Sequence, residues 1–114
     1  MKKENSEIIG YQYFERVKSN LMHFSRLLSE LEGMSGDEYE GGRKVLMSYL
    51  ESILNELRIS SNFVEDDERM EVEKKLMECM GHLSMRDSEK ALKSLGEAIS
   101  LVATSANKRA KSIL

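Results

Sequence analysis

Apolar residues recur along most of this chain at alternating steps of three and four, and no proline interrupts them. This spacing places the apolar residues on one stripe of an α-helix, because a helical turn contains 3.6 residues. No stretch alternates apolar and polar residues as a strand does, and no Asn-Gly or Asp-Gly pair marks a hairpin. The pattern therefore predicts an all-α protein.

Breaks in the apolar pattern divide the chain into four helices, which we expect at about 7–32, 37–61, 66–83 and 87–113. Ser6, Ser35 and Asp87 or Ser88 stand where helix N-caps are expected, because their side chains can accept a hydrogen bond from a free backbone N–H. Gly33 stands where a left-handed residue would end the first helix.

The pair Gly41–Gly42 leaves the start of the second helix open. Two glycines cost a helix about 2 kcal/mol relative to two alanines, so this helix could begin only at Arg43. Free N–H groups at residues 40–44 could also bind phosphate, but the glycine spacing is not that of a P-loop. We interpret the glycines as permitting a late helix start or the close approach of a neighbouring element.

Four amphipathic helices joined by short loops predict an antiparallel up-down four-helix bundle that forms one domain over residues 1–114. The predicted core stripes, in chain order, are Phe14, Val17, Leu21, Phe24, Leu28 and Leu31; Tyr39, Leu46, Leu50, Ile53, Leu54 and Leu57; Met70, Leu76, Met77, Met80 and Leu83, flanked by Val72 and Cys79; and Ala91, Leu92, Leu95, Ala98, Ile99, Val102, Ala106 and Ile113. The first and last helices are longer than the third, which leaves part of their apolar stripes without a partner inside one chain. We expect a symmetric homodimer to cover these parts.

The composition excludes several classes of protein. With 40% hydrophobic and 32% charged residues the chain is not a disordered tail, and its net charge of −3 does not suit a general nucleic-acid binder. No apolar run is long enough to span a membrane or to act as a signal peptide. Cys79 is the only cysteine and cannot form a disulfide within the chain, so we expect a cytoplasmic protein.

The residues that could carry chemistry do not assemble into a site by their spacing. Cys79 and His82 are possible zinc ligands, but His23 is the only other histidine and two ligands do not make a site. The Glu-x-x-His pattern of di-iron bundles is absent. We therefore predict no cofactor, no metal and no catalytic activity, while a hydrolase built on Cys79 and His82 remains an alternative.

Two local patterns resemble known families. Residues 80–101, with Gly81, Ala91 and Ala98, resemble the helical hairpin of a tetratricopeptide-type repeat, which implies two helices packed through small residues. Arg16 and His23 have six residues between them, a spacing similar to that of the HEPN-type helical ribonucleases, although Val17 replaces their usual polar residue. That likeness implies a hydrolase that uses Arg16 and His23.

The function we predict is protein–protein interaction or self-association through a buried apolar helix face. Methionine packs adaptably and is common at protein-binding surfaces. The candidate partner surface comprises Phe63, Met70, Met77 and Met80. The alternative is a nucleic-acid-associated accessory protein that uses a basic end, formed by Lys2, Lys3, Lys108, Arg109 and Lys111.

Overall fold

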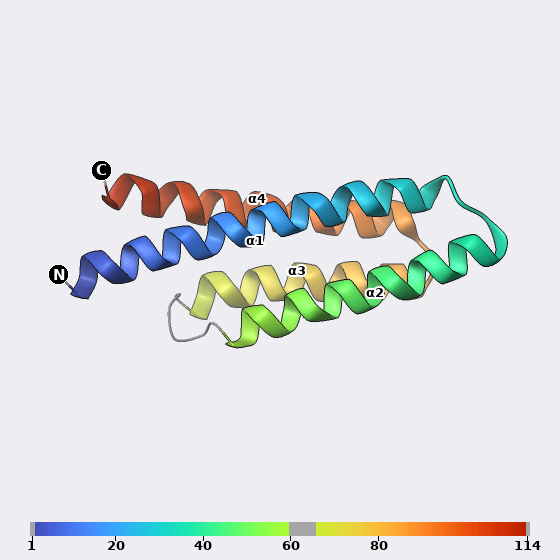
Figure 1. The fold of residues 1–114 in the computed structure, drawn as a ribbon, viewed down its shortest axis with the longest axis horizontal. Coiled ribbons are helices and arrows are strands. Elements are labelled where there is room, and N and C mark those ends of the chain that lie inside the picture. Colours follow the sequence, from blue (N-terminus) through green and yellow to red (C-terminus); the bar gives the residue numbers. More distant parts are fainter. Residues whose placement is uncertain (1, 60–65, 114) are drawn as a thin grey trace.

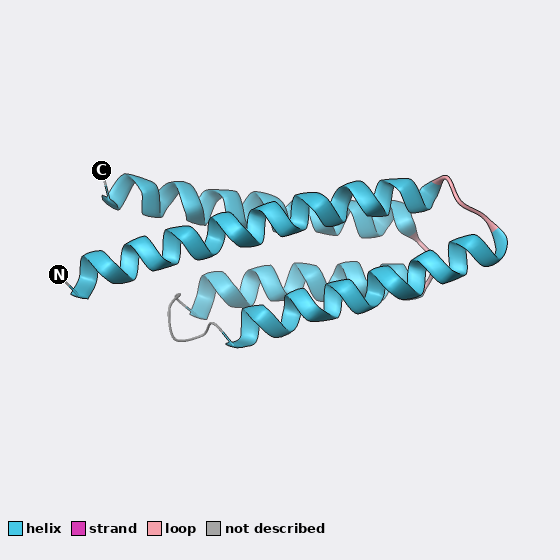
Figure 2. Ribbon diagram, viewed as in Figure 1, coloured by secondary structure: helices cyan, strands magenta, loops and turns pink. Residues whose placement is uncertain are grey.

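The computed structural model describes residues 2–59 and 66–113, and the side chains of residues 7–59 and 67–113. The described part consists of four α-helices: α1 (Lys2–Glu32), α2 (Gly36–Ile59), α3 (Asp66–Ser84) and α4 (Ser88–Ile113). They run up and down in one elongated bundle of 55 × 22 × 17 Å, with both termini at the same end (Figure 1). Helices are the only regular elements of these residues (Figure 2), so the predicted all-α four-helix fold is confirmed.

Each helix packs against two neighbours, in the cyclic order α1, α2, α3, α4. The core between them contains most of the predicted stripes of the first, second and fourth helices, together with a buried face of α3. Ile113, which was predicted in the fourth stripe, is 41% exposed and lies outside the core. The largest fully buried side chains of the core are Phe14, Phe24, Leu21, Leu28, Leu31, Leu50, Leu57, Leu76, Leu83, Leu95, Val17 and Val72. Burial of each such side chain stabilises the fold by about 1.5–3 kcal/mol.

The two most extensive helix pairings both involve α4. The buried face of α4 carries mainly small residues, namely Ala91, Ser94, Ala98, Ser105 and Ala106. Small side chains allow neighbouring backbones to approach closely. The small residues expected on the second helix of the hairpin are therefore buried, whereas Gly81 on the first helix is exposed, with nothing within 4 Å of the position of a Cβ atom there.

Several predicted helix ends differ from the structure. α1 begins at Lys2, five residues before the predicted start, so Ser6 is not its N-cap. Gly33 is not left-handed: Gly33 N–H donates to the Glu30 carbonyl at 3.1 Å and Met34 N–H to the Leu31 carbonyl at 3.0 Å, and these tight turns end α1. The left-handed glycine is Gly36, the first residue of α2, with φ of 60°.

The glycine pair lies inside α2, which begins at Gly36 and not at Arg43. A Cβ atom on Gly42 would lie 2.8 Å from Leu31 Cδ1, so Gly42 permits the close approach of a side chain from α1. The predicted N-cap of the fourth helix is confirmed, because Lys90 N–H donates to Asp87 Oδ1 at 3.1 Å. The described part of α2 ends at Ile59, and residues 60 and 61 of the predicted helix lie outside the described residues.

Candidate protein-binding surface

The candidate surface lies on the outward face of α3. Met70 is 57% exposed and Met77 is 55% exposed, so the prediction that both belong to the bundle core is wrong. The residues that α3 buries are Val72, Leu76, Cys79 and Leu83, two of which we had expected on the flank. The third helix is therefore rotated about its axis relative to the predicted orientation.

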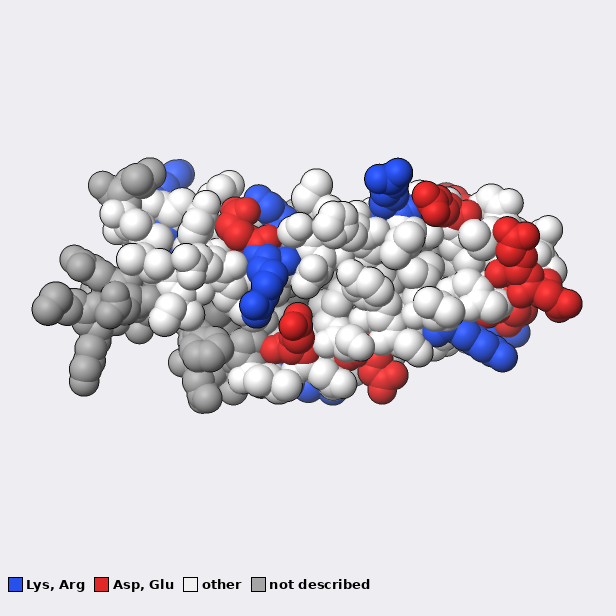
Figure 3. All heavy atoms as spheres, viewed as in Figure 1, with Lys and Arg blue, Asp and Glu red and all other residues white. Residues whose placement is uncertain are grey.

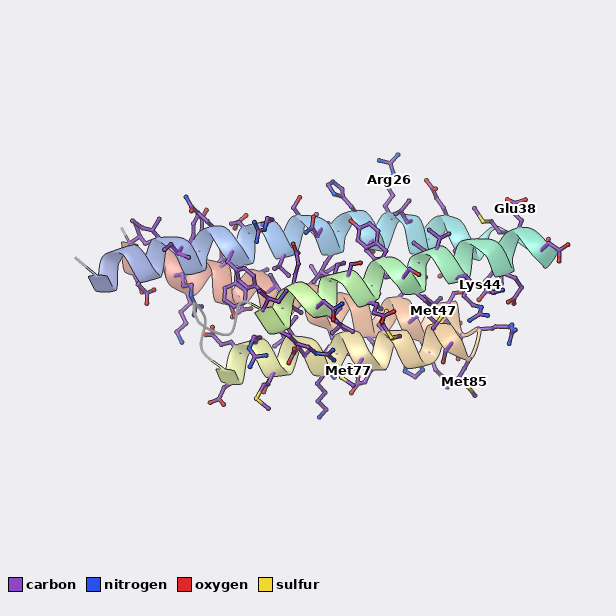
Figure 4. All side chains as sticks on the ribbon, turned by 60° about the horizontal axis from the view of Figure 1, so that its bottom comes forward. Arg26, Glu38, Lys44, Met47, Met77 and Met85 are labelled. Carbon is purple, nitrogen blue, oxygen red and sulfur yellow. The ribbon has the colours of Figure 1, made fainter. Side chains whose placement is uncertain are left out.

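A single stripe of α3 points away from the bundle. Met70, Lys74, Met77 and Gly81 follow one another at steps of four, three and four residues and so share one face of the helix. We call these four residues the methionine face. Figure 4 shows Met77 at the outer edge of α3, on the side away from α1, and Met85 just beyond the end of the helix. Met85 is also exposed, at 80%.

A shallow hollow of about 510 Å³ lies on this face. It is lined by Met70, Glu73, Lys74, Met77 and Glu78. The first four stand at positions i, i+3, i+4 and i+7 of one helix, which is the set of four residues that receives a side chain of a facing helix in knobs-into-holes packing. The hollow can therefore accept a side chain from a second helix.

Some charged side chains near the hollow form ion pairs within the chain and others do not. Glu73 lies 3.2 Å from Arg69 Nη1 and 3.6 Å from Arg58 Nε, and its side chain is only 14% exposed. It is thus occupied by cations of its own chain. Glu71 and Lys74 form no ion pair within the part of the chain that the structure describes. Lys74 lines the hollow and Glu71 lines the neighbouring groove between α3 and α4, so these two exposed charges of opposite sign remain available to a partner beside the methionine face.

The other two residues of the predicted partner surface have different positions. Met80 is half-buried and packs against the core, so it is not part of the exposed methionine face. Phe63 lies outside the described residues.

A groove of about 650 Å³ between α3 and α4 borders the methionine face. Lys75 Nζ lies 3.0 Å from Glu97 Oε2, so an ion pair crosses the groove. The hydrogen bond to Glu97 raises the pKa of Lys75 above its ordinary value. This ion pair therefore links α3 to α4.

The predicted basic end does not form as expected, because Arg109 lies inside the bundle. Only 7% of Arg109 is exposed, and its Nη1 donates to Glu68 Oε2 at 2.7 Å. Its guanidinium lies over the Phe14 ring at 4.7 Å from the centroid, and a Cβ atom on Gly10 would lie 2.7 Å from Arg109 Nε. The side chain thus joins α1, α3 and α4 and is not a free cation.

Two other basic residues of that end, Lys108 and Lys111, are exposed in the described part of the chain. Lys108 Nζ lies 3.4 Å from the same Glu68 carboxylate. The side chains of Lys2 and Lys3 lie outside the described ones. Figure 3 shows that acidic side chains gather at the opposite end of the face it displays, next to the turn between α1 and α2. The geometry therefore favours the methionine face over the basic end.

The candidate catalytic and metal-binding residues do not come together. Cys79 is fully buried, and this burial raises the pKa of its thiol to about 12, which removes the reactive thiolate at neutral pH. His23 is exposed on α1, while His82 is half-buried on α3. Among the described residues no three His, Cys, Asp or Glu side chains converge on a point where a metal ion could bind. Arg16 and His23 are seven residues apart on one helix, about 10 Å along its axis, too far for direct proton transfer.

A cluster of charges fixes the turn between α3 and α4. Arg86 Nε donates to Glu40 Oε1 at 2.6 Å, and Arg43 Nη2 donates to Glu40 Oε2 at 2.9 Å. The hydrogen bonds from Arg86 and Arg43 lower the pKa of Glu40 from 4.5 to about 2. Next to this cluster, a hydrogen bond of 3.1 Å joins Tyr39 Oη and Ser88 Oγ.

Comparison with known proteins gives no further guidance: no family model, curated protein or solved structure matches this chain. The likenesses to tetratricopeptide and HEPN-type helices therefore remain local. Within the described residues, none of the helices combines the length and the apolar character that crossing a membrane requires.

Proposed function

We propose that this chain is a non-catalytic protein-interaction module whose binding surface is the methionine face of α3. A single observation carries the proposal: Met70 and Met77 are both more than half exposed on a helix whose opposite side is fully buried. Apolar side chains clustered on one exposed face are typical of binding surfaces, whereas single ones are common anywhere. The hollow between these methionines is lined by residues with the spacing that receives one side chain of a facing helix.

We place this module in the cytoplasm and expect a second copy of the chain as its first partner. The only cysteine is a buried thiol, so the fold needs no oxidising compartment. A helical partner requires no cofactor, since burial of apolar surface drives its association.

The test separates binding from folding. We would replace Met70 and Met77 by glutamine, which keeps the helix propensity and the length of the side chain but makes its end polar. Because both methionines are more than half exposed, the urea midpoint should change little, while association should be lost. Association would be measured as solution mass by analytical ultracentrifugation and as capture of partners on immobilised protein.

Val45→Gln provides the matched control, because Val45 is 67% exposed on α2 and outside the methionine face. The control should associate like the wild type. The proposal would be wrong if Met70→Gln/Met77→Gln associated like the wild type in both measurements. It would also be wrong if the double variant lost stability and association in parallel, since that would place the methionines in the core.

A further inference from the structure

Resting on this proposed function, we infer that the helix which occupies the methionine face is α3 of a second copy, packed antiparallel about a twofold axis. The exposed methionines lie at the two ends of the hollow, seven residues apart. In an antiparallel pair centred between residues 73 and 74, Met70 of each copy contacts Met77 of the other. One surface then supplies both the side chains that insert and the hollows that receive them, as a twofold interface requires.

The charges beside the methionines complement one another in this arrangement. Lys74 of one copy lies opposite position 73 of the other copy. Position 73 is two residues, or about 3 Å along the helix axis, from Glu71 of that other copy. In an antiparallel twofold pair the same flank of both helices faces the same side, so Lys74 of each copy reaches Glu71 of the other. These two residues form no ion pair within the described part of one chain. The dimer would therefore give both Lys74 and Glu71 an ion-pair partner.

The size of the contact predicts its strength. α3 has 19 residues and is about 28 Å long, so the paired helices bury less area than a standard protein interface. Interfaces of this size are typical of weak or transient complexes, so we expect a reversible dimer and would look for it at protein concentrations between about 10 µM and 1 mM. Sedimentation equilibrium over this range should show a mass that rises from one chain to two.

Single cysteines test the direction of the helices. Lys74→Cys places a thiol next to the twofold axis, and under mild oxidation two copies should form a disulfide. Gly81→Cys is the control: it lies on the same face, and nothing lies within 4 Å of the position of its Cβ. In the antiparallel pair position 81 lies opposite position 66, so two thiols at residue 81 are about 22 Å apart and should not join. Native Cys79 is buried and should stay reduced.

A charge exchange tests the register. Lys74→Glu places like charges together twice in each dimer, so it should weaken the dimer about tenfold. Adding Glu71→Lys to the same chain restores opposite charges and should recover most of this loss. Raised salt should reduce the difference between the variants.

Three results would overturn the inference. They are a monomer at every concentration, disulfides with equal yield at positions 74 and 81, and a dimer that survives Met70→Gln/Met77→Gln but is lost on Ile8→Gln/Ile9→Gln at the termini end. If the protein is a monomer at every concentration but still captures another protein, and this capture is lost on Met70→Gln/Met77→Gln, the inferred dimer is wrong and the proposed function remains. Loss of every association that depends on the methionine face would remove both proposals.

Discussion

Glu40 joins α2 to the turn between α3 and α4. It lies in the second turn of α2 and binds Arg43 on its own helix and Arg86 in the turn between α3 and α4. The backbone at Arg86 is left-handed, with φ of 61°, a conformation for which glycine is usually preferred. The hydrogen bonds from Arg86 N–H to the Leu83 carbonyl and from Asp87 N–H to the His82 carbonyl complete a Schellman motif around this residue. We attribute the arginine at this position to its ion pair with Glu40.

The stability of the protein should therefore depend on pH through Glu40. Because the pKa of this carboxyl falls to about 2 in the folded state, its stabilising effect is complete above pH 4.5 and disappears as the pH falls toward 2. Glu40→Gln should be less stable than the wild type at pH 7, and this difference should close between pH 4.5 and 2. Urea unfolding followed by circular dichroism at several pH values measures it.

Glu51→Gln is the control for this series, because the exposed Glu51 lies in the middle of α2, away from the helix N-termini, and forms no ion pair within the described residues. Its stability should follow that of the wild type at every pH. The difference in free energy of unfolding between Glu40→Gln and the wild type could instead stay constant down to pH 2. That result would show that the pKa of Glu40 is not lowered in the folded state.

At the scale of the helices, the contact between α1 and α4 depends on the absence of a side chain at Gly10. Arg109 Nε and Cδ lie 2.7 and 3.0 Å from where a Cβ atom would be, and Arg109 is held by Glu68 and Phe14. Gly10→Ala should destabilise the fold, because overpacking costs about 1–3 kcal/mol and the better helix propensity of alanine returns only about 1 kcal/mol.

Gly96→Ala is the matched control within α4. Nothing lies within 4 Å of the position of its Cβ, so this variant should gain up to about 1 kcal/mol in its free energy of unfolding. The two variants should therefore change stability in opposite directions in urea unfolding. Equal gains would contradict the close packing of Arg109 against Gly10.

The sequence predicts the helices better than it predicts their orientation. For α1, α2 and α4 one apolar stripe is much stronger than any other, so residues such as Leu21 and Leu50 were correctly expected in the core. α3 carries two stripes, one through Val72 and Cys79 and another through Met70 and Met77. Both fit the helical period, and only packing against α2 and α4 decides which of them is buried.

The sequence analysis also differs from the structure in the partners of the charged side chains, because these partners are far apart in the sequence. The spacing of Glu40 and Lys44 suits an ion pair within one helix, yet Glu40 binds Arg43 and the distant Arg86. Arg109 lies among other basic residues near the end of a helix, a pattern that predicts an exposed side chain. It is buried because Glu68, 41 residues away, supplies its counter-charge. No local pattern contains these partners, so the basic end could not be judged from the sequence.

For the molecule as a whole, its elongated shape distinguishes two kinds of dimer. Pairing along α3 places two copies side by side, because α3 runs along the 55 Å axis (Figure 1). Pairing through the termini end, where Ile8, Ile9 and Ile113 are 40–45% exposed, would place the copies end to end. The two arrangements have the same mass but very different lengths.

Small-angle X-ray scattering over a concentration series should therefore decide between them. As the dimer forms, we expect the cross-section to grow while the longest dimension stays well below twice 55 Å. Met70→Gln/Met77→Gln should keep the scattering curve of one chain at every concentration, and Val45→Gln should follow the wild type. A longest dimension that approaches twice that of one chain would contradict the side-by-side dimer, because only contact at the ends of the bundle can extend it so far.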